Sequence, residues 1–463
     1  MSALNLAIGD LARTIPGAIL HGDAATRISM VSTDSRTLKR GALFVALVGD
    51  RFDGHDYAEA ARERGAGALL VQRELRIALP QIVVADARRA FGLAAAAWRA
   101  RFDLPLIAVT GSNGKTSVTQ MLGGILGAAF GETKRLVTRG NLNNEIGLPL
   151  MLFELASVHR AAALELGMNH PGEIAYLAEL AHPTVALVNN AQREHQEFMT
   201  SVEATAHENG AAIAALPPDG VAVFPADDPC VAIWRRAAGT RRVFDFARAT
   251  AAAVTARYDL HPGGADLSIA TPIGVIDVEL QLAGEHNVHN ALAATAAALA
   301  IGVAPAAIKA GLQAARAAAG RGGRSKIAGG GVLIDDTYNA NPDSVRAAID
   351  VLAECRSPRV LVLGDMGEVG AEGPAFHREV GAYARERRTD ALLALGEASR
   401  DAVAAFGPGG RHFDDADALI AAVRAISTRQ STVLVKGSRF MRMERVVAAL
   451  TQRETGKERA GAH

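Results

Sequence analysis

The residues from Val109 to Ser117, Val-Thr-Gly-Ser-Asn-Gly-Lys-Thr-Ser, have the types and spacing needed to hold a nucleotide phosphate. Gly111 and Gly114 let backbone N–H groups approach a phosphate. Lys115 brings a positive charge to the β- and γ-phosphates, and the hydroxyl of Thr116 can ligate Mg²⁺. The common spacing would place its first glycine at position 109, where this chain has valine. A Gly-rich turn that binds nothing is the alternative interpretation.

The segments on either side of this loop have to position it. Residues 106–110 are mostly apolar and predict a buried strand, and a helix is expected from Lys115 to about Ala129. Strand, glycine loop and helix N-terminus form the context that a phosphate loop requires, because the helix N-terminus attracts anions. The candidate nucleotide-binding residues of the loop are Gly111, Ser112, Asn113, Gly114, Lys115, Thr116 and Ser117.

Two polar residues stand where apolar strands should end. Glu165 ends the segment 161–165, and His195 follows the strand expected at 184–189. Ligands of open α/β sheets bind at the carboxyl ends of the strands, so Glu165 is a candidate ligand for Mg²⁺. His195 can ligate a metal through a neutral ring nitrogen. A surface glutamate and a structural histidine are the alternatives.

Two later segments also carry polar side chains at the boundaries of elements. The segment 284–290, Gly-Glu-His-Asn-Val-His-Asn, opens a helix, and Asn287 and Asn290 can either read a base edge or cap that helix. The strand before Pro342 ends in Asp335 and Asp336. At least one of these carboxylates can bind ribose hydroxyls, and an Asx turn is the competing interpretation.

Composition limits the classes of function. The chain has 463 residues, enough for about three domains, and its zero net charge argues against a general nucleic-acid binder. Its two cysteines, Cys230 and Cys355, suit a reducing compartment. The first 18 residues lack a basic region before an apolar core, and no run of about 18 apolar residues occurs. We therefore expect a cytoplasmic protein that does not insert into a membrane.

Strands alternate with helices along most of the chain, which predicts an α/β fold with parallel sheets. We expect three domains: a small N-terminal α/β domain at 1–103, a central parallel-sheet phosphate-loop ATPase domain at 104–318, and a Rossmann-like C-terminal domain at 319–463. The third domain lacks Gly-x-Gly-x-x-Gly at its first turn. Its expected strands are 331–335, 359–363, 391–395 and 432–436, and its expected helices are 344–354 and 374–386.

Taken together, these segments resemble the Mur ligase family, the ATP-dependent amide-forming enzymes of peptidoglycan precursor synthesis. The resemblance covers nearly the whole chain, and the family's version of the phosphate loop explains the valine at position 109. It implies catalytic roles for Lys115, Glu165, His195 and Arg321, and Mg²⁺ binding by Thr116, Glu165 and His195. It also implies ATP binding by the phosphate loop together with Asn287, Asn290, Arg321 and Asp336.

The segment 335–344, Asp-Asp-Thr-Tyr-Asn-Ala-Asn-Pro-Asp-Ser, discriminates between members of the family. It resembles the member that adds D-alanyl-D-alanine to UDP-N-acetylmuramoyl-tripeptide, and the segments 140–149, 363–370 and 436–439 resemble it too. The sister enzyme usually carries Asp-Asn-Pro-Arg, whereas Pro342 here precedes Asp343. The resemblance implies uridine-nucleotide binding by Ser32, Asp34, Ser35, Arg36, Asn141 and Asn144, and dipeptide binding by Asn339, Asn341 and Ser438.

The implied reaction makes an acyl phosphate from the tripeptide's carboxylate and ATP, and the dipeptide's amine then displaces phosphate. We expect a monomer whose partners are these two substrates. A sister ligase that adds a single amino acid and a folylpolyglutamate synthetase-like ligase are alternatives, and a nucleotide-switched binding protein is an alternative of another class. Phosphate release that depends on both acceptors distinguishes the ligase from the switch.

One departure from the family pattern concerns a lysine. Many Mur ligases carry, shortly after the metal-binding histidine, a lysine that CO₂ carbamylates into an anionic metal-side ligand. In this chain His207 takes the lysine's place by alignment, and no lysine occurs from 135 to 308. We therefore expect an enzyme that works without carbamylation, with Glu194 and Glu208 as local candidates for the anion. Either glutamate can equally be a solvated helix residue.

Overall fold

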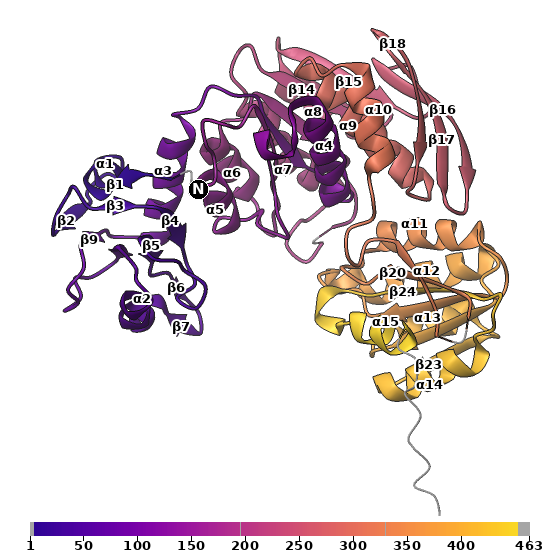
Figure 1. Cartoon of the computed structure of the whole chain (residues 1–463). Coiled ribbons are helices and arrows are strands. Elements are labelled where there is room, and N and C mark those ends of the chain that lie inside the picture. The colour runs from indigo at the N-terminus through magenta and orange to yellow at the C-terminus, as the bar shows by residue number, and fades with distance from the viewer. Residues whose placement is uncertain (1–3, 195, 329, 452–463) are drawn as a thin grey trace, which may run out of the picture.

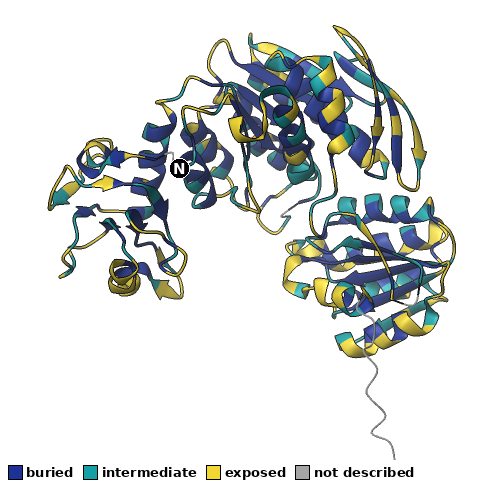
Figure 2. Cartoon of the chain, in the orientation of Figure 1, coloured by how far each residue is buried: buried dark blue, intermediate teal, exposed yellow. Residues whose placement is uncertain are grey.

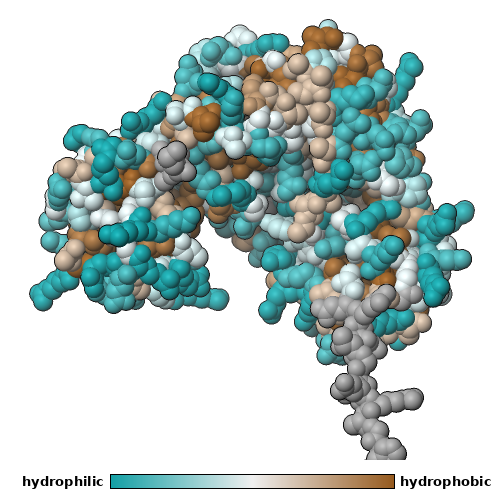
Figure 3. All heavy atoms as spheres, viewed as in Figure 1, coloured by the Kyte–Doolittle hydropathy of each residue, from teal (hydrophilic) through white to brown (hydrophobic). Residues whose placement is uncertain are grey.

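The computed structural model describes residues 4–194, 196–328 and 330–451. Within these ranges the chain forms three lobes that follow one another in sequence, with the first and third on either side of the central lobe (Figure 1). A deep concavity separates the first lobe from the third beneath the central one (Figure 3). None of the helices in the described ranges has the length and apolar character needed to cross a membrane.

The first lobe is built on a five-stranded sheet in the order β2-β9-β8-β5-β4, parallel except for β2. The central strands β5 and β8 are apolar throughout and buried along their whole length, as expected for a parallel sheet covered on both faces. The strands are β1 (Leu6–Ala7), β2 (Ile19–His21), β3 (Arg27–Ile28), β4 (Met30–Ser32), β5 (Ala42–Val45), β6 (Val48–Gly49), β7 (Phe52–Asp53), β8 (Ala68–Val71) and β9 (Gln81–Val83). The α-helices are α1 (Ile8–Ala12), α2 (Ala58–Glu63) and α3 (Ala87–Arg99).

The central lobe contains a nine-stranded sheet in the order β11-β12-β10-β13-β14-β15-β16-β17-β18. It is parallel from β11 to β16, and β17 and β18 extend it as antiparallel strands. The strands are β10 (Leu106–Thr110), β11 (Arg135–Val137), β12 (Ala161–Glu165), β13 (Val185–Val188), β14 (Val221–Pro225), β15 (Arg242–Ala247), β16 (Val254–His261), β17 (Gly264–Thr271) and β18 (Gly274–Leu280). The helices are α4 (Lys115–Phe130), α5 (Gly147–Leu152), α6 (Glu173–Ala181), α7 (Val202–Ala214), α8 (Val231–Ala238), α9 (Glu285–Ala300) and α10 (Pro305–Ala314).

Helices cover both faces of the parallel part of this sheet, where β10, β12, β13 and β14 are buried along their whole length (Figure 2). Along β10, Leu106 and Ala108 face the core formed with α5 to α8, whereas Ile107 and Val109 face the core formed with α4, α9 and α10. This alternation is the period of two that a strand imposes. A strand buried on both faces is the rigid support that the phosphate loop needs.

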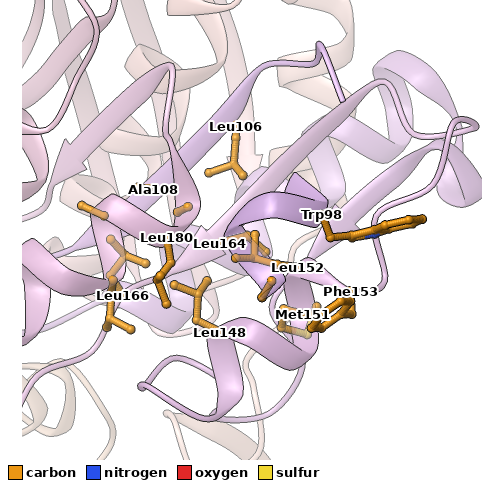
Figure 4. Close-up of a cluster of buried hydrophobic side chains, with 14 of the residues drawn as sticks. Trp98, Leu106, Ala108, Leu148, Met151, Leu152, Phe153, Leu164, Leu166 and Leu180 are labelled. Atoms are coloured by element: carbon orange, nitrogen blue, oxygen red, sulfur yellow. The ribbon is translucent and has the colours of Figure 1, made fainter. Parts of the chain in front are cut away.

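Helix α3 joins the first lobe to the central lobe. The side chain of Asp86 caps its N-terminus, and its apolar face packs against α5 and α6. Phe91 stacks on Phe153 with ring centroids 6.0 Å apart, and Trp98 Nε1 donates to the carbonyl of Leu155 at 3.2 Å. Figure 4 shows Trp98 and Phe153 within this shared cluster of leucines. The two lobes therefore share one continuous hydrophobic core.

The third lobe contains a six-stranded sheet in the order β19-β20-β24-β21-β22-β23, parallel except for β19. Helices α11 to α13 cover one face, and α14 and α15 cover the other. The strands are β19 (Gly323–Lys326), β20 (Val332–Asp336), β21 (Arg359–Gly364), β22 (Ala391–Leu395), β23 (Gly410–Phe413) and β24 (Thr432–Lys436). The helices are α11 (Pro342–Ala353), α12 (Gly373–Glu386), α13 (Arg400–Phe406), α14 (Ala416–Ile426) and α15 (Glu444–Thr451).

The structure confirms the predicted three-domain α/β class. The four strands and two helices expected in the third lobe agree with it to within about two residues, as element boundaries generally do. Two edge strands were not predicted, because β19 is polar and largely exposed and β23 is only half-buried. Each of the three large sheets takes its strands from one of the blocks 1–103, 104–318 and 319–463, and these domain bounds stay our proposal.

Candidate active site

A cleft of about 2290 Å³ lies between the central and third lobes. Pockets for one small ligand usually measure roughly 300–1,000 Å³, so this cleft has room for more than one. Among the residues that line it are these site residues predicted from the sequence: Ser112, Asn113, Gly114, Lys115, Ser117, Asn141, Asn144, Glu165, Asn287, Asn290, Arg321, Asp336, Asn339, Asn341 and Ser438. His195, predicted as a metal ligand, lies outside the described residues.

The loop between β10 and α4 has the geometry of a phosphate cradle. Gly111 has a φ of 124° and Gly114 a φ of 86°, values that residues with a side chain rarely adopt. A Cβ atom at Gly114 would lie 2.3 Å from Asn290 Oδ1 and 2.5 Å from Asn189 Nδ2. Glycine is therefore required at position 114 by both conformation and space. The helix begins at Lys115, directly after the loop, as predicted.

Lys115 folds back over the loop. Its Nζ donates to the carbonyl of Gly111 at 2.7 Å and to that of Ser112 at 3.0 Å. It also lies 3.2 Å from both carboxylate oxygens of Glu194, and the two side chains are only 14% and 10% exposed. Glu194, considered above as a metal-side anion, is thus the counter-ion of Lys115 in this structure. Glu194 and the two loop carbonyls together keep this ammonium over the loop.

Glu165 is held at the end of β12 with its carboxylate beside the loop. Oε2 accepts from the hydroxyl of Thr116 at 2.9 Å, and Oε1 accepts from Asn143 Nδ2 at 2.7 Å. The residue is 2% exposed, so it is not a surface glutamate. Asn143 was missed, although it belongs to the segment from which Asn141 and Asn144 were chosen.

The donor set beside the loop suits Mg²⁺. A hydroxyl and a carboxylate are oxygen ligands of the kind this cation prefers, and Mg²⁺ usually takes one or two carboxylates and completes its shell with water and substrate phosphates. In the described part of the chain, no three His, Cys, Asp or Glu side chains gather closely enough to hold a metal by themselves. Thr116 and Glu165 are therefore the described residues that fit a nucleotide-bound cation.

A chain of asparagine side chains supports the loop. Asn189 Nδ2 donates to the carbonyl of Asn113 at 2.8 Å and to Asn290 Oδ1 at 2.9 Å. Asn290 Nδ2 in turn donates to Asn287 Oδ1 at 3.2 Å. Of the two asparagines, Asn287 also donates through Nδ2 to the carbonyl of Ala283, just before α9, at 2.9 Å, so a role at the helix start stays the alternative. Both line the cleft, and base recognition stays a prediction.

The ends of β20 and β24 bring charged groups from the third lobe into the cleft. Lys436 Nζ donates to Asp336 Oδ2 at 2.6 Å and to the carbonyl of Asn339 at 3.0 Å. Asp335 Oδ1 accepts from the backbone and hydroxyl of Thr337, which is the Asx turn expected as one alternative. The two adjacent carboxylates therefore have different roles, and Asp336 is the one that lines the cleft.

The predicted dipeptide residues have internal partners. Asn341 caps α11 and donates through Nδ2 to Asn113 Oδ1 of the phosphate loop at 3.0 Å. Ser438 Oγ accepts from the backbone of Gly367 at 2.7 Å and donates to the carbonyl of Ala340 at 3.0 Å. Asn341 and Ser438 therefore organise the wall of the cleft, and direct contact with a dipeptide stays a prediction.

Arg321 also lines the cleft, and its guanidinium carbon lies 4.0 Å from the centroid of the Tyr338 ring. Such cation–π stacking fixes the plane of the side chain. The planar guanidinium is well suited to binding phosphate oxygens in pairs. This placement fits the predicted phosphate contact.

The predicted uridine residues of the first lobe form a compact turn after β4. Ser32 Oγ donates to the carbonyl of Asp34 at 3.0 Å and accepts from its backbone N–H at 3.1 Å. Hydrogen bonds from Arg36 hold the pKa of the Asp34 carboxyl below its usual value. Ser35 is buried beside them. These four residues are not among those that line the cleft, whereas Asn141 and Asn144 are.

Comparison with known proteins assigns the family. Models of the Mur ligase family match residues 27–102 (catalytic domain), 109–298 (middle domain) and 320–439 (glutamate ligase domain). The chain belongs to the Mur ligase family. It is 43% identical, over 94% of its length and 97% of the relative's, to the UDP-N-acetylmuramoyl-tripeptide–D-alanyl-D-alanine ligase of Escherichia coli K12. It is 37% identical to the ligase of the same name in Haemophilus influenzae, over 94% of this chain and 96% of that one. A crystal structure of MurF from Acinetobacter baumannii superposes with a TM-score of 0.91 at 36% identity, covering 97% of this chain and 100% of that one.

The structure changes the expectation for the lysine position of this Mur ligase. His207 on α7 is exposed, and neither His207 nor Glu208 is among the residues that line the cleft. The carboxylate of Glu208 accepts two backbone N–H groups at the start of α6, each at 2.9 Å, so it acts as a helix cap. Glu208, one of the two glutamates expected on the metal side, therefore acts as a helix cap in this structure, and His207, which the alignment puts in the lysine's place, is exposed.

The α7 residue that contacts the phosphate loop is Asn209. It is fully buried, and its Oδ1 accepts from the hydroxyl of Thr110 at 2.7 Å and from the backbone of Gly111 at 3.1 Å. The side-chain oxygen of Asn209 thus holds the start of the loop through two hydrogen bonds. Unlike a lysine, an asparagine cannot be carbamylated. Sequence reasoning missed it because nothing in the sequence shows which side of α7 faces the loop.

Proposed function

We propose that this Mur ligase joins D-alanyl-D-alanine to the terminal carboxylate of UDP-N-acetylmuramoyl-tripeptide, with ATP and Mg²⁺. One observation carries the proposal: the segment that most resembles the dipeptide-adding member lies against the phosphate loop. Asn341 of that segment is hydrogen-bonded to Asn113 of the loop. The names of the relatives that match nearly the full chain support the same activity.

The chemistry follows from the groups in the cleft. A carboxylate oxygen of the tripeptide attacks the γ-phosphorus, and the bond to the β-phosphate oxygen breaks, releasing ADP. The amine of the dipeptide then attacks the acyl carbon, loses a proton, and phosphate leaves. Lys115 would neutralise charge on the transferring phosphoryl group, as preorganised cations do in phosphoryl transfer. Mg²⁺, when held by Thr116 and Glu165, would supply further positive charge, and His195 stays a proposed ligand.

The third lobe completes the nucleotide site in this proposal. Asp336 would bind the ribose and Arg321 the phosphates, while Asn287 and Asn290 of the central lobe would lie on the adenine side. Both lobes line one cleft, so their approach excludes water from the acyl phosphate. Asn339 would contact the dipeptide. The turn formed by Ser32, Asp34, Ser35 and Arg36 would bind the uridine nucleotide, with Asn141 and Asn144 nearer the reacting end.

Phosphate release in the presence of ATP tests the proposal. Release should require both the UDP-linked tripeptide and D-alanyl-D-alanine, and mass spectrometry should find the pentapeptide product. Release with UDP-muramoyl dipeptide and a single amino acid would instead indicate the sister ligase. Equal release without either acceptor would indicate a nucleotide-switched binding protein. Lysine- and diaminopimelate-containing tripeptides assayed in parallel identify the third residue, and we further propose a cytoplasmic monomer.

A further inference from the structure

A short segment, residues 190–194, contacts both the phosphate loop and the third lobe, and we refer to it as the strap. Every second residue of the strap contacts the loop. Asn190 Oδ1 accepts from the backbone of Asn113 at 2.9 Å, and Gln192 Oε1 accepts from the Asn113 side chain at 2.6 Å. Glu194 pairs with Lys115. The loop and its lysine are thus held by alternate side chains of one segment.

Arg193, between these residues, contacts the third lobe instead. Its Nη2 lies 2.6 Å from Asp343 Oδ1 on α11, and its Nη1 lies 2.6 Å from Glu379 Oε2 on α12. Its guanidinium carbon is 5.1 Å from the centroid of the Phe376 ring. The strap turns tightly at Arg193, where the backbone N–H of Glu194 donates to the carbonyl of Gln192 at 2.9 Å. Arg193 can therefore contact α11 and α12 while its neighbours contact the loop.

The contacts of Arg193 are strong for a partly exposed group. Its side chain is 24% exposed, and the backbone N–H of the same residue also donates to Asp343 Oδ2 at 2.9 Å. Glu379 is fixed further by Arg346, 3.1 Å away. The planar guanidinium forms paired, charge-assisted hydrogen bonds that a lysine cannot reproduce. These contacts cross from the central lobe to the third lobe, so they exist only while the two lobes are together.

We propose that Arg193 is a positioning residue for Lys115. By connecting the strap to α11 and α12, Arg193 fixes Glu194, and Glu194 in turn holds the Lys115 ammonium over the phosphate loop. The position of the Lys115 ammonium, which would contact ATP, therefore depends on whether the third lobe has approached the central lobe. This inference rests on the proposed ligase function. Arg193 itself touches no reacting atom.

The test replaces Arg193 by glutamine. Losing the contact lowers the fraction of molecules with a correctly placed lysine, and the apparent affinity for ATP falls by that fraction. We expect kcat/KM for ATP to drop about tenfold, with KM for ATP rising more than KM for the tripeptide. Arg193→Lys should restore only part of the loss, because it keeps the charge without the fork. The control is Arg378→Gln. Arg378 lies beside Glu379 on α12 but pairs with Asp401 inside the third lobe.

A second measurement does not depend on turnover. Acetic anhydride acetylates free amines, and peptide mass spectrometry reports the rate at Lys115 in the full-length protein. We expect acetylation of Lys115 to be about threefold faster in Arg193→Gln than in the wild type and unchanged in Arg378→Gln, because a loosened strap leaves the ammonium less often paired. Glu379→Gln breaks the same contact from the other lobe and should reproduce the effect if Arg193→Gln fails to fold.

The outcomes separate the inference from the function on which it rests. A wild-type protein without dipeptide-dependent phosphate release overturns the proposed function. An active wild type whose Arg193→Gln and Glu379→Gln variants match Arg378→Gln in KM for ATP and in Lys115 acetylation overturns the role of Arg193. Faster acetylation with a selective rise in KM for ATP supports it. Non-additive effects in the Arg193→Gln/Glu379→Gln double variant place both residues in one contact.

Discussion

Replacing Lys115 by methionine removes the ammonium and keeps most of the side chain's volume. In the structure this ammonium lies 2.7 Å and 3.0 Å from two loop carbonyls and 3.2 Å from the carboxylate of Glu194, in the place where a phosphate would bind. Losing one preorganised donor costs about 10²–10³ in kcat. At ~1.36 kcal/mol for each factor of ten, this is roughly 2.7–4 kcal/mol of transition-state stabilisation.

The effect on folding requires separate consideration, because Glu194 loses its cation. The Glu194 side chain is only 10% exposed, and losing a charged hydrogen-bond partner at such a site costs about 1–3 kcal/mol. The Lys115→Met/Glu194→Gln double variant removes that cost by neutralising the carboxylate. We therefore expect the double variant to recover stability in urea unfolding without recovering turnover.

The assay measures kcat from phosphate release at saturating ATP, tripeptide and dipeptide, together with the urea midpoint of each variant. A kcat at least ~10²-fold below wild type in both variants is expected. A folded Lys115→Met protein that turns over within about tenfold of the wild type would refute the assignment of this loop to the γ-phosphate. A stability loss that persists in the double variant would refute the role given to Glu194.

Three further predictions concern the nucleotide, the lysine position and pH. Asp336→Asn, which can still accept a hydrogen bond from Lys436, should raise KM for ATP about tenfold and KM for the tripeptide much less, because a ribose contact is mostly uniform binding; the reverse pattern in steady-state kinetics would assign Asp336 to another site. Activity and intact mass should be the same in decarbonated buffer and with added bicarbonate, since neither His207 nor Asn209 can carry a stable carbamate, and a rise in activity with bicarbonate would contradict this. Desolvation lowers the pKa of His289, so the folded state binds fewer protons than the unfolded state and stability should fall as pH drops below about 6.5. His289→Gln should reduce that fall in urea unfolding between about pH 7.5 and 5.5, and an unchanged slope would show that other groups cause it.

The sequence by itself determined the features that depend on neighbouring residues. The phosphate loop could be predicted because its glycines, lysine and threonine lie within six residues of one another and an apolar strand precedes them. Glu165 was found for the same reason, since a carboxylate that ends an apolar strand lies at the carboxyl edge of a parallel sheet. Alternation of apolar strands and helices likewise fixed the fold class, because burial on both faces of a sheet requires it.

The partners of these residues were decided only by tertiary structure. Asn113 and Asn341 are separated by 228 positions and Arg193 and Asp343 by 150, so no local pattern relates them. Asn143 differs from Asn141 and Asn144 only through the fold of the segment 140–149, which brings its Nδ2 to the carboxylate of Glu165.

Helix α7 shows the same limit on a smaller scale. Its sequence carries alanines or other small residues on several sides, so the pattern does not say which side is buried. The docking of α7 against β10 and α6 places Asn209 at the phosphate loop, leaves His207 exposed and uses Glu208 as a cap. A difference of two positions along a helix rotates a side chain by roughly 200°, and only packing determines which one faces the site.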